Sequence, residues 1–419
     1  MHAAPESISI LFSEGSSLSA RQAISALGPL GYRIDVCDPN RLCMSRFSRF
    51  LRRFYRSPSL GKDPKAYFDF ILDRLTKERY DVLLPVHEQA FLFARMQRTL
   101  QTKVGLALTP FDQFKLLQSK ATFAQVMAEI GIPQPATRVV HSRAEIEAET
   151  HFPYYVKLPY STAGRGVWPV TDASERSLVI QELEKEGHFD GQNEIIIQAG
   201  VQGVQCQAQA VFEHGRLIAC HCTSQRSVGV GGSQSARLSV DHPIVRTHLS
   251  RIGEHLGWHA ALTMDYFYDP ATIQPVFIEA NPRLVESINA VLSGVNLPDI
   301  LVRLSLGESF KQTPVQCGRP GVRTHSLLAT ILSRALATGS RTQVAAELLQ
   351  ALTGHGVYED SAEDLTPCRL DLPSIVPLSV VMMRLLVRPG LARRLSSQAV
   401  ADYSLTPRAV RTICDLVDI

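Results

Sequence analysis

The chain has 419 residues, 45% of them hydrophobic and 20% charged, with a formal net charge of +3. This length is typical of two or three domains with a sizeable core, and the small net charge argues against a nucleic-acid-binding protein. No run reaches the roughly 18 apolar residues that a transmembrane segment needs, and the N-terminus lacks the pattern of a signal peptide. We therefore expect a cytoplasmic protein whose eight cysteines are reduced.

The N-terminal segment has the pattern of a doubly wound parallel sheet. Apolar runs over residues 8–12 and 32–38 predict two strands, and the segment 19–30 between them predicts a helix that ends at Gly31. A strand–helix–strand opening of this kind is typical of α/β domains. The glycine-rich dinucleotide fingerprint is missing, so no nicotinamide cofactor is expected.

Residues 45–56 are rich in arginine and aromatic side chains. Their spacing predicts an amphipathic helix with a solvated basic face. Contact with an anionic partner is the alternative interpretation.

An acidic residue follows the next predicted strand. A helix over 67–79 leads to a buried strand over 80–86, and Glu88 comes just after it. Polar groups at the carboxyl ends of strands commonly line the crevice of an open α/β sheet. Glu88 is therefore a candidate substrate contact, and an acidic residue at a helix N-terminus is the alternative.

A second unit begins near residue 110, and it carries two lysines of interest. A helix is predicted over 114–130, with Lys120 inside it. Further along, a strand over 154–159 carries Lys157 and runs into a loop of small residues over 161–167. Backbone N–H groups of such a loop can cradle phosphate oxygens, and a lysine adds a positive charge. The loop does not have the P-loop sequence.

The next strands surround a polar turn and a loop. A strand over 194–198 ends at Gln198, and the strands 205–212 and 216–223 form a predicted hairpin. The segment 227–237 has no apolar periodicity, so we expect a mobile loop from which Arg237 can reach a ligand. An ordinary flexible hairpin tip is the alternative.

The segment 264–283 predicts two antiparallel strands joined by a turn. Glu279 and Asn281 are two residues apart on the second strand, so they face the same side, and Asp265 can face them from the first. Mg²⁺ prefers hard oxygen ligands of this kind. Arg283 continues the same face as a planar donor for a carboxylate or a phosphate. A solvated strand face with a chance acidic pair is the alternative.

The order of these motifs resembles the ATP-grasp superfamily, in particular its carboxylate–amine ligases and the synthetase domains of carbamoyl-phosphate synthetase. The run from Glu279 to Arg283, in its context, is the most specific match. The resemblance implies an α/β fold with a two-subdomain ATP-grasp core. The implied domains are an N-terminal doubly wound parallel-sheet domain over 1–112, an ATP-grasp domain over 113–310 with its lid at about 135–205, and a largely helical C-terminal extension over 311–419.

The resemblance also implies a role for each matching position, with ATP and Mg²⁺ (or Mn²⁺) as cofactors. The implied nucleotide contacts are Lys120, Lys157, the loop residues Ala163, Gly164, Arg165 and Gly166, and the hinge residues Gln198, Val201 and Gln205. The implied metal ligands are Asp265, Glu279 and Asn281. The implied catalytic residues are Arg283, Lys157 and Arg237, and the implied substrate contacts are Glu88, Arg283 and Ser287.

Two positions depart from the pattern of the superfamily. Ala199 stands where many members have a glutamate after the hinge glutamine, and Gln205 stands where many have an acidic contact to the ribose. Because glutamine can still hydrogen-bond a ribose hydroxyl, ATP binding is expected to survive.

The implied activity is a ligase that activates a small-molecule carboxylate as an acyl phosphate and joins it to an amine. One alternative is a bicarbonate-using carboxylase or carbamoyl-phosphate-type enzyme, although the chain has neither a biotin-carrier Met-Lys-Met tripeptide nor a glutaminase region. The other alternative is a non-catalytic ATP-binding regulatory protein.

The most apolar segment of the tail is 375–389. Pro377 and Arg384 interrupt it, so we expect a helix that packs on the core or on a second copy in a homodimer. Because Arg393 and Arg394 follow, contact with an anionic membrane surface is the alternative.

Overall fold

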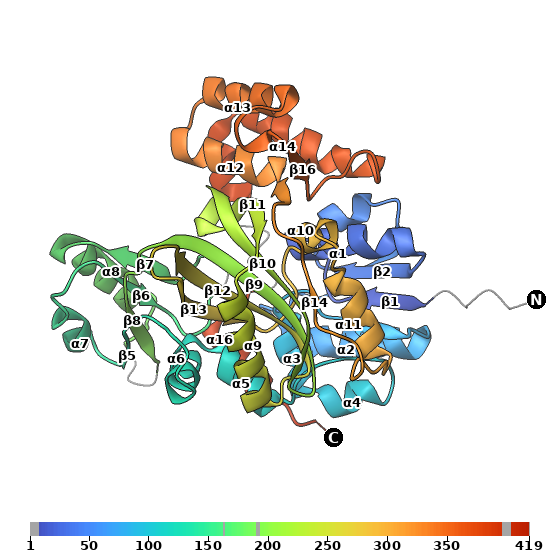
Figure 1. The fold of residues 1–419 in the computed structure, drawn as a ribbon, viewed down its shortest axis with the longest axis horizontal. Coiled ribbons are helices and arrows are strands. Elements are labelled where there is room, and N and C mark those ends of the chain that lie inside the picture. The colour runs from blue at the N-terminus through green and yellow to red at the C-terminus, as the bar shows by residue number, and fades with distance from the viewer. Residues whose placement is uncertain (1–7, 162–163, 190–192, 396–403, 419) are drawn as a thin grey trace, which may run out of the picture.

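The computed structural model describes residues 8–161, 164–189, 193–395 and 404–418. Figure 1 shows the N-terminal domain in blue on one side of a large central sheet and a small green lid on the other, with a group of C-terminal helices above. None of the described helices combines the length and the apolar character needed to cross a membrane.

The N-terminal domain contains a parallel sheet in the order β3-β2-β1-β4, which confirms the predicted doubly wound opening. Helix α1 begins after Ser17, whose side chain accepts a hydrogen bond from the Ala20 N–H. The chain then reverses at Gly31, whose φ of 87° lies in the left-handed region that favours glycine. The elements are β1 (Ser9–Phe12), α1 (Leu18–Leu27), β2 (Arg33–Asp38), β3 (Leu51–Arg56), α2 (Pro64–Lys77), β4 (Val82–Leu84), α3 (Gln89–Arg95) and α4 (Gln97–Gln101).

The arginine-rich segment forms β3, so the amphipathic helix predicted over 45–56 is wrong. This strand pairs with β2 at the edge of the sheet. The Arg52 guanidinium lies 2.6 Å from the carboxylate of Asp35, which is buried. The Arg53 guanidinium lies 2.6 Å from the carboxylate of Glu78, which is half-buried. The spacing of apolar and basic residues favours a helix locally. Backbone pairing with β2 and the ion pairs to Asp35 and Glu78 favour a strand instead, and they decide the conformation. Charged side chains on an edge strand also discourage pairing with other chains.

The helix predicted over 114–130 is divided at Ser119 into α5 (Phe111–Gln118) and α6 (Lys120–Glu129). Ser119 has an extended backbone, and its hydroxyl accepts a hydrogen bond from the Ala121 N–H. Lys120 is therefore the first residue of α6 and does not lie inside a continuous helix. Its N–H donates to the Pro159 carbonyl over 3.0 Å, which holds the start of α6 against the end of the lid strand β6.

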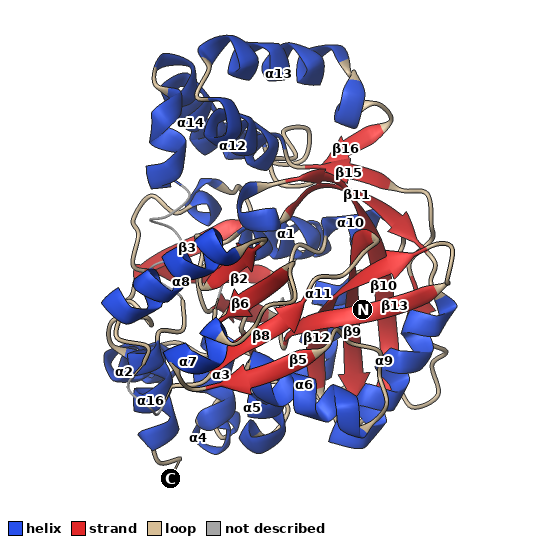
Figure 2. Ribbon diagram, turned by 90° about the vertical axis from the view of Figure 1, so that its left-hand side faces the viewer, coloured by secondary structure: helices blue, strands red, loops and turns tan. Residues whose placement is uncertain are grey.

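The lid is an antiparallel sheet in the order β5-β8-β6-β7, which faces the viewer in Figure 2. Apolar side chains of its strands and of α8 form a separate core that includes Val156, Leu183 and Ile195. The elements are β5 (Thr137–Val140), α7 (Arg143–Glu147), β6 (Tyr154–Lys157), β7 (Val167–Val170), α8 (Ala173–Lys185) and β8 (Ile195–Ala199).

The central sheet has the order β13-β12-β9-β10-β11-β15-β16, and the short strand β14 pairs with β10. The mobile loop predicted over 227–237 is wrong, because β10 continues to Val228 and β11 begins at Gln234. Several polar side chains of β11 are buried, including those of Ser235 and Arg237. The prediction treated this polar sequence as a solvent-exposed loop, whereas it belongs to a buried strand. The elements are β9 (Val204–Glu213), β10 (Arg216–Val228), β11 (Gln234–Val240), α9 (Pro243–Leu256), β12 (Ala260–Asp269) and β13 (Gln274–Asn281).

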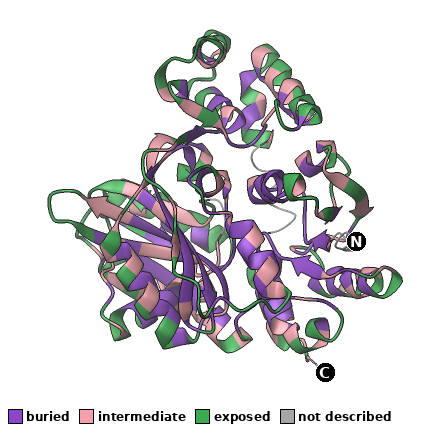
Figure 3. Ribbon diagram, turned by 45° about the vertical axis from the view of Figure 1, so that its right-hand side comes forward, coloured by how far each residue is buried: buried purple, intermediate pink, exposed green. Residues whose placement is uncertain are grey.

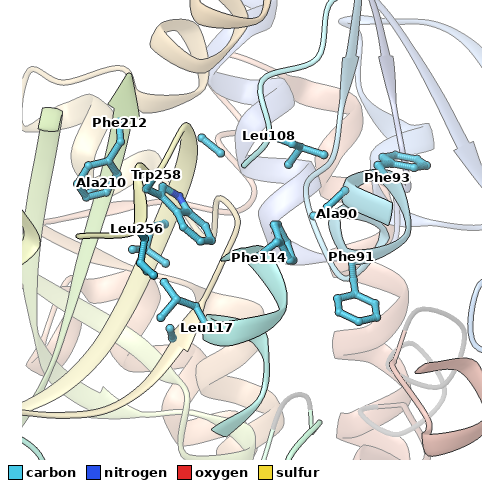
Figure 4. Packing of buried hydrophobic residues seen from close by; sticks show 14 of the residues in the cluster. Ala90, Phe91, Phe93, Leu108, Phe114, Leu117, Ala210, Phe212, Leu256 and Trp258 are labelled. Carbon is cyan, nitrogen blue, oxygen red and sulfur yellow. The ribbon is translucent and has the colours of Figure 1, made fainter. Parts of the chain in front are cut away.

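The main core joins the N-terminal domain to the central sheet, as Figure 4 shows. The rings of Phe114 on α5 and Trp258, which follows α9, stack with their centroids 5.9 Å apart. Phe91 on α3 packs against Phe114 at 6.3 Å. Because these side chains come from both units and are fully buried, their packing fixes one unit against the other.

The C-terminal extension is largely helical, as predicted, but its first part adds β14, β15 and β16 to the central sheet. Helices α12, α13 and α14 stand above the sheet around a small core of their own, and Figure 3 shows exposed residues on their outer faces. The division of the chain at residues 112 and 310 stays a prediction. Two helices precede the extension, α10 (Ile288–Leu292) and α11 (Leu297–Ser305). The elements of the extension are β14 (Gln316–Cys317), β15 (Arg323–His325), α12 (Leu327–Thr338), α13 (Arg341–Thr353), β16 (Ser361–Glu363), α14 (Ile375–Val387) and α16 (Pro407–Asp415).

The side chains of two acidic residues help to fasten the extension to the N-terminal domain. The Asp371 carboxylate lies 2.7 Å from the buried guanidinium of Arg21 on α1, and it also accepts a hydrogen bond from the Ser48 hydroxyl. Near the end of the chain, the Asp418 carboxylate accepts hydrogen bonds from the N–H groups of Arg98 and Thr99 at the start of α4. The extension therefore encloses the first domain from two sides.

Candidate functional site

The predicted metal ligands lie together on the paired strands β12 and β13. Asp265 stands directly opposite Glu279 in the strand register, and the Asn281 amide donates to the Asp265 carboxylate over 3.1 Å. The register shifts between Asp265 and Tyr266, so the regular alternation of β12 is interrupted next to the acidic pair. The structure thus brings the three predicted oxygen-bearing side chains to one place.

The two carboxyl groups have opposite pKa shifts. Burial, followed by repulsion from Glu279, raises the pKa of the Asp265 carboxyl to about 7. Burial alone would also raise the pKa of Glu279, but the positive charges of Lys120 and Lys157 outweigh it and lower that pKa. The charge repulsion within the pair is the physical reason that a divalent cation would suit this place. Two adjacent carboxylates and an amide oxygen are a donor set that fits Mg²⁺.

The two predicted phosphate-binding lysines lie near the acidic pair. The Lys120 ammonium is 3.1 Å from the Glu279 carboxylate. The Lys157 ammonium, on the lid strand β6, donates to the side-chain carbonyl of Gln198 over 2.6 Å. Burial lowers the pKa of the Lys157 ammonium to about 8, against the attraction of Glu279. Both lysines therefore bring positive charge to the acidic pair from different parts of the fold.

The glycine-rich lid loop meets a second glycine-rich turn. Gly164 and Gly166 have positive φ angles of 74° and 68°. A Cβ at Gly164 would come within 2.7 Å of the Gly231 carbonyl oxygen, so only glycine allows this approach to the β10–β11 turn. Arg165 between them is exposed. Ala163, the other loop position predicted to contact phosphate, lies outside the described residues.

The predicted hinge connects the lid to the central sheet. Gln198 is buried at the end of β8, and its amide donates to the Thr137 hydroxyl over 3.2 Å. Val201 is half-buried in the turn that follows, and Gln205 is half-buried near the start of β9. The three predicted adenosine contacts therefore lie along one connection, which begins beside Lys157.

Arg283 joins the acidic pair to the N-terminal domain. Its guanidinium lies 3.0 Å from the side-chain carbonyl of Asn281 and 3.2 Å from the Glu88 carboxylate. Glu88 stands at the N-cap of α3 without a capping hydrogen bond to that helix, and its contact with a substrate stays a prediction. Burial, followed by the charge of Arg283, holds the pKa of the neighbouring His87 well below its usual range, so this imidazole is neutral.

Arg237 is buried within β11, so the mobile loop predicted to carry it is wrong, while its contact with a ligand stays a prediction. Its guanidinium lies 3.1 Å from the Asp364 carboxylate and 3.4 Å from that of Glu286. Asp364 belongs to the C-terminal extension, so the extension supplies one partner of this arginine. Ser287, a predicted substrate contact, is fully buried next to Glu286, and its hydroxyl has no hydrogen-bond partner among the described residues.

Sequence reasoning missed three polar residues of this region. The Gln207 amide donates to the Asp265 carboxylate over 2.9 Å, and the Gln209 amide donates to the Gln207 side chain over 3.2 Å. The alternation of glutamines along β9 is a signal that could have identified them as one polar face. Asp364 had no such signal, since 127 residues separate it from Arg237.

Comparisons with known proteins find similar sequences for the part of the chain that carries this site. Residues 119–313 match the family described as "Carbamoyl-phosphate synthase L chain, ATP binding domain". The carbamoyl phosphate synthase large chain of Helicobacter pylori is 23% identical over 321 residues, which are 71% of this chain and 28% of that protein. The chain thus spans under a third of the length of this curated relative.

Solved structures share the fold at low sequence identity. N5-carboxyaminoimidazole synthetase from Staphylococcus aureus, complexed with ADP, has a TM-score of 0.59 at 14% identity over 78% of this chain and 84% of that one. The L-amino acid ligase from Bacillus licheniformis has a TM-score of 0.55 at 14% identity over 73% and 75%. The biotin carboxylase domain of Hydrogenobacter thermophilus 2-oxoglutarate carboxylase has a TM-score of 0.60 at 16% identity over 75% and 73%.

The fold and the order of the site residues therefore define an ATP-grasp protein. Within that superfamily, residues 119–313 are similar to the carbamoyl-phosphate synthase ATP-binding domain, and this match covers just under half of the chain.

The Asp364 carboxyl makes the stability of the protein depend on pH. Burial raises its pKa to about 7, although Arg237 acts in the opposite direction. Between about pH 4 and pH 7 the folded protein therefore holds a proton that an ordinary unfolded aspartate, with a pKa near 3.9, has lost. The contribution to the unfolding free energy is complete below about pH 4 and falls towards pH 7, by at most about 1.4 kcal/mol per pH unit.

We predict that Asp364→Asn flattens this pH dependence. Urea unfolding at about pH 5 and about pH 7 should show a smaller loss of unfolding free energy in the variant than in the wild type, because asparagine binds no proton in this range. Glu359→Gln, at an exposed position nearby, is the control and should keep the wild-type difference. Equal differences in Asp364→Asn and the wild type would contradict the prediction.

Proposed function

We propose that this protein is an ATP- and Mg²⁺-dependent ligase that activates a carboxylate as an acyl phosphate and joins it to an amine. The observation that carries the proposal is the facing pair Asp265 and Glu279, with Lys120 and Lys157 close enough to shift the pKa of Glu279. Arg283 contacts the same cluster through Asn281. This arrangement suits the transfer of a charged phosphoryl group, which depends on positioning and charge neutralisation.

ATP would lie between the lid and the central sheet. In this proposal Lys120, Lys157 and the N–H groups of Gly164, Arg165 and Gly166 bind its phosphates, since a glycine-rich turn presents several donors to one anion. Gln198, Val201 and Gln205 would flank the adenosine. The ADP complexes of the N5-carboxyaminoimidazole synthetase and of the 2-oxoglutarate carboxylase domain, which share this fold, support the choice of nucleotide.

Mg²⁺ held by Asp265, Glu279 and Asn281 would neutralise phosphate charge and polarise the transferred phosphoryl group. The reaction would then proceed in two steps. An oxygen of the substrate carboxylate attacks the γ-phosphorus of ATP, and ADP leaves as an acyl phosphate forms. The nitrogen of the amine attacks the acyl carbon, the amide bond forms, and the bond from the acyl carbon to the phosphate oxygen breaks. Inorganic phosphate leaves with the proton that the nitrogen loses.

Arginines and small polar groups would orient the substrates during these steps. Arg283 and Arg237 would hold the carboxylate and the transferred group, because a guanidinium can donate two hydrogen bonds to such an anion. Lys157, with a pKa of about 8, remains largely protonated at neutral pH and would stabilise the phosphoryl charge. Glu88 and Ser287 would contact the substrates, and closure of the lid would keep water from the acyl phosphate.

Two other functions would use the same residues. Bicarbonate could replace the organic carboxylate, since the 2-oxoglutarate carboxylase domain was crystallised in complex with a bicarbonate anion as well as ADP. A regulatory protein would bind ATP without turnover. We favour an enzyme over a regulatory protein, because paired metal ligands serve phosphoryl transfer more than simple binding. We place this ligase in the cytoplasm as part of the proposal.

The central prediction concerns turnover of Mg-ATP. Release of ADP and phosphate should require a pool of carboxylic acids together with a pool of amines, and Glu279→Gln should reduce the rate by about 10²-fold or more, because it removes charge that stabilises the transfer. A coupled spectrophotometric assay measures ADP, and dividing the active pools identifies the substrates.

Glu254→Gln on the exposed side of α9 is the matched control and should retain the wild-type rate. Release of ADP and phosphate with bicarbonate alone would contradict the amide ligase and indicate a carboxylase-type reaction. ATP binding without release in any pool would favour a regulatory role.

We also propose that the exposed face of α14 joins two copies of the chain. Val376, Val380 and Met383 lie three or four residues apart and are 43%, 41% and 66% exposed, while the opposite face packs against α12 and α13 through Leu385. A row of this kind is typical of a helix–helix contact. We expect sedimentation to give a dimer for the wild type and a monomer for Val380→Glu combined with Met383→Glu.

Gln350→Glu on the exposed side of α13 is the control for that experiment and should remain dimeric. A wild-type chain that stays monomeric at tens of micromolar would refute the contact. If the monomer sediments with anionic vesicles, α14 would instead be a membrane-contacting helix.

A further inference from the structure

Two cysteines far apart in the sequence lie side by side at the edge of the central sheet. Cys220 on β10 and Cys317 on β14 are direct partners in the parallel strand register. Their sulfur atoms are 3.5 Å apart. Cys220 is buried and Cys317 is exposed. Paired residues on neighbouring strands are close enough for a disulfide to form after a small rotation of the two side chains.

The surroundings of the two thiols differ in a way that favours oxidation. The guanidinium of Arg246 on α9 lies 3.4 Å from the Cys317 sulfur. The hydrogen bond from Cys220, followed by that from Arg246, lowers the pKa of the Cys317 thiol to about 6. The same bond to Cys317, together with burial, raises the pKa of Cys220. The pair therefore combines an exposed sulfur beside a positive charge with a buried sulfur 3.5 Å away.

We propose that Cys317 and Cys220 form a peroxide-sensitive dithiol, in which Cys317 is attacked first and Cys220 resolves the product into a disulfide. The Cys317 thiolate attacks one oxygen of the peroxide, the O–O bond breaks, and hydroxide leaves, which oxidises Cys317 to a sulfenic acid. The Cys220 sulfur then attacks the Cys317 sulfur. The S–S bond forms, the S–O bond breaks, and the Cys220 proton leaves with the hydroxyl group as water.

Such a bond would fasten a segment that is otherwise held by a short strand. β14 has two residues, and Gly318 after it packs so closely on β10 that a Cβ there would lie 2.1 Å from the His221 ring. His221 in turn lies 2.8 Å from the side chain of Asn289 on α10. A disulfide would close a loop of 97 residues and link the start of the C-terminal extension covalently to the sheet.

The test uses the full chain in its reduced form, treated with hydrogen peroxide and then alkylated. Trypsin leaves Cys220 within residues 217–226 and Cys317 within residues 312–323. We expect mass spectrometry to find these two peptides joined, two mass units lighter than their sum, and separated again by dithiothreitol. Because residues 217–226 also contain Cys222, fragmentation must assign the bond to Cys220.

Variants separate the two steps of the reaction. Cys220→Ser should leave Cys317 as a sulfenic acid that dimedone labels, and Cys317→Ser should leave Cys220 reduced. Arg246→Gln should slow the peroxide reaction several-fold, because it removes the neighbouring positive charge. Cys368 and Cys414, which are half-buried, are internal controls and should react more slowly with iodoacetamide at about pH 7 than Cys317.

Three outcomes would overturn the proposal, and all three need only the wild-type chain. One is alkylation of Cys317 no faster than that of Cys368. Another is peroxide treatment that leaves the pair reduced, or that oxidises Cys317 to a sulfinic acid while Cys220 stays a thiol. The third is a bond assigned to Cys222. None of these outcomes depends on the proposed ligase activity.

Discussion

The electrostatic balance at Asp265 and Glu279 is the constraint on which the site depends. Antiparallel pairing of β12 and β13 sets the two carboxyl groups opposite each other, and the protein offsets their repulsion with lysines from elsewhere. Lys120 stands at the first position of α6, and Lys157 belongs to the lid. In the proposed function, the same charges would hold a cation and the phosphates of ATP.

The C-terminal extension supplies strands to the central sheet and acidic partners to two buried arginines, in addition to its own group of helices. Strands β15 and β16 continue the central sheet, and the residue after β16, Asp364, pairs with Arg237. Asp371 pairs with Arg21 in the first domain. Buried ion pairs of this kind are costly to break once formed, because the remaining charge would be left without a partner. The extension is thus bound to both the site and the N-terminal domain.

Much of the site could be predicted because its residues are ordered along regular strands. The two-residue spacing of Glu279 and Asn281 fixes their common side, and the short turn after Asp269 brings Asp265 to them. The parallel opening and the lid strands followed from apolar runs for the same reason. These features depend on local periodicity, which a sequence displays directly.

The remaining features depended on contacts between distant segments. The edge strand β3 has helical spacing, but pairing with β2 decides its conformation. Arg237 was expected in a loop because its strand is rich in small polar residues, and its partner Asp364 comes from the extension. Ser119 divides the predicted long helix through its extended backbone, which composition does not reveal.

Calorimetric titration of ADP, with and without Mg²⁺, tests the central claim about the acidic pair most directly. We predict that Mg²⁺ strengthens ADP binding to the wild type by about tenfold or more, and that Asp265→Asn with Glu279→Gln abolishes this gain while the protein remains folded. ADP binding that is equally tight with and without Mg²⁺ in the wild type would contradict the claim.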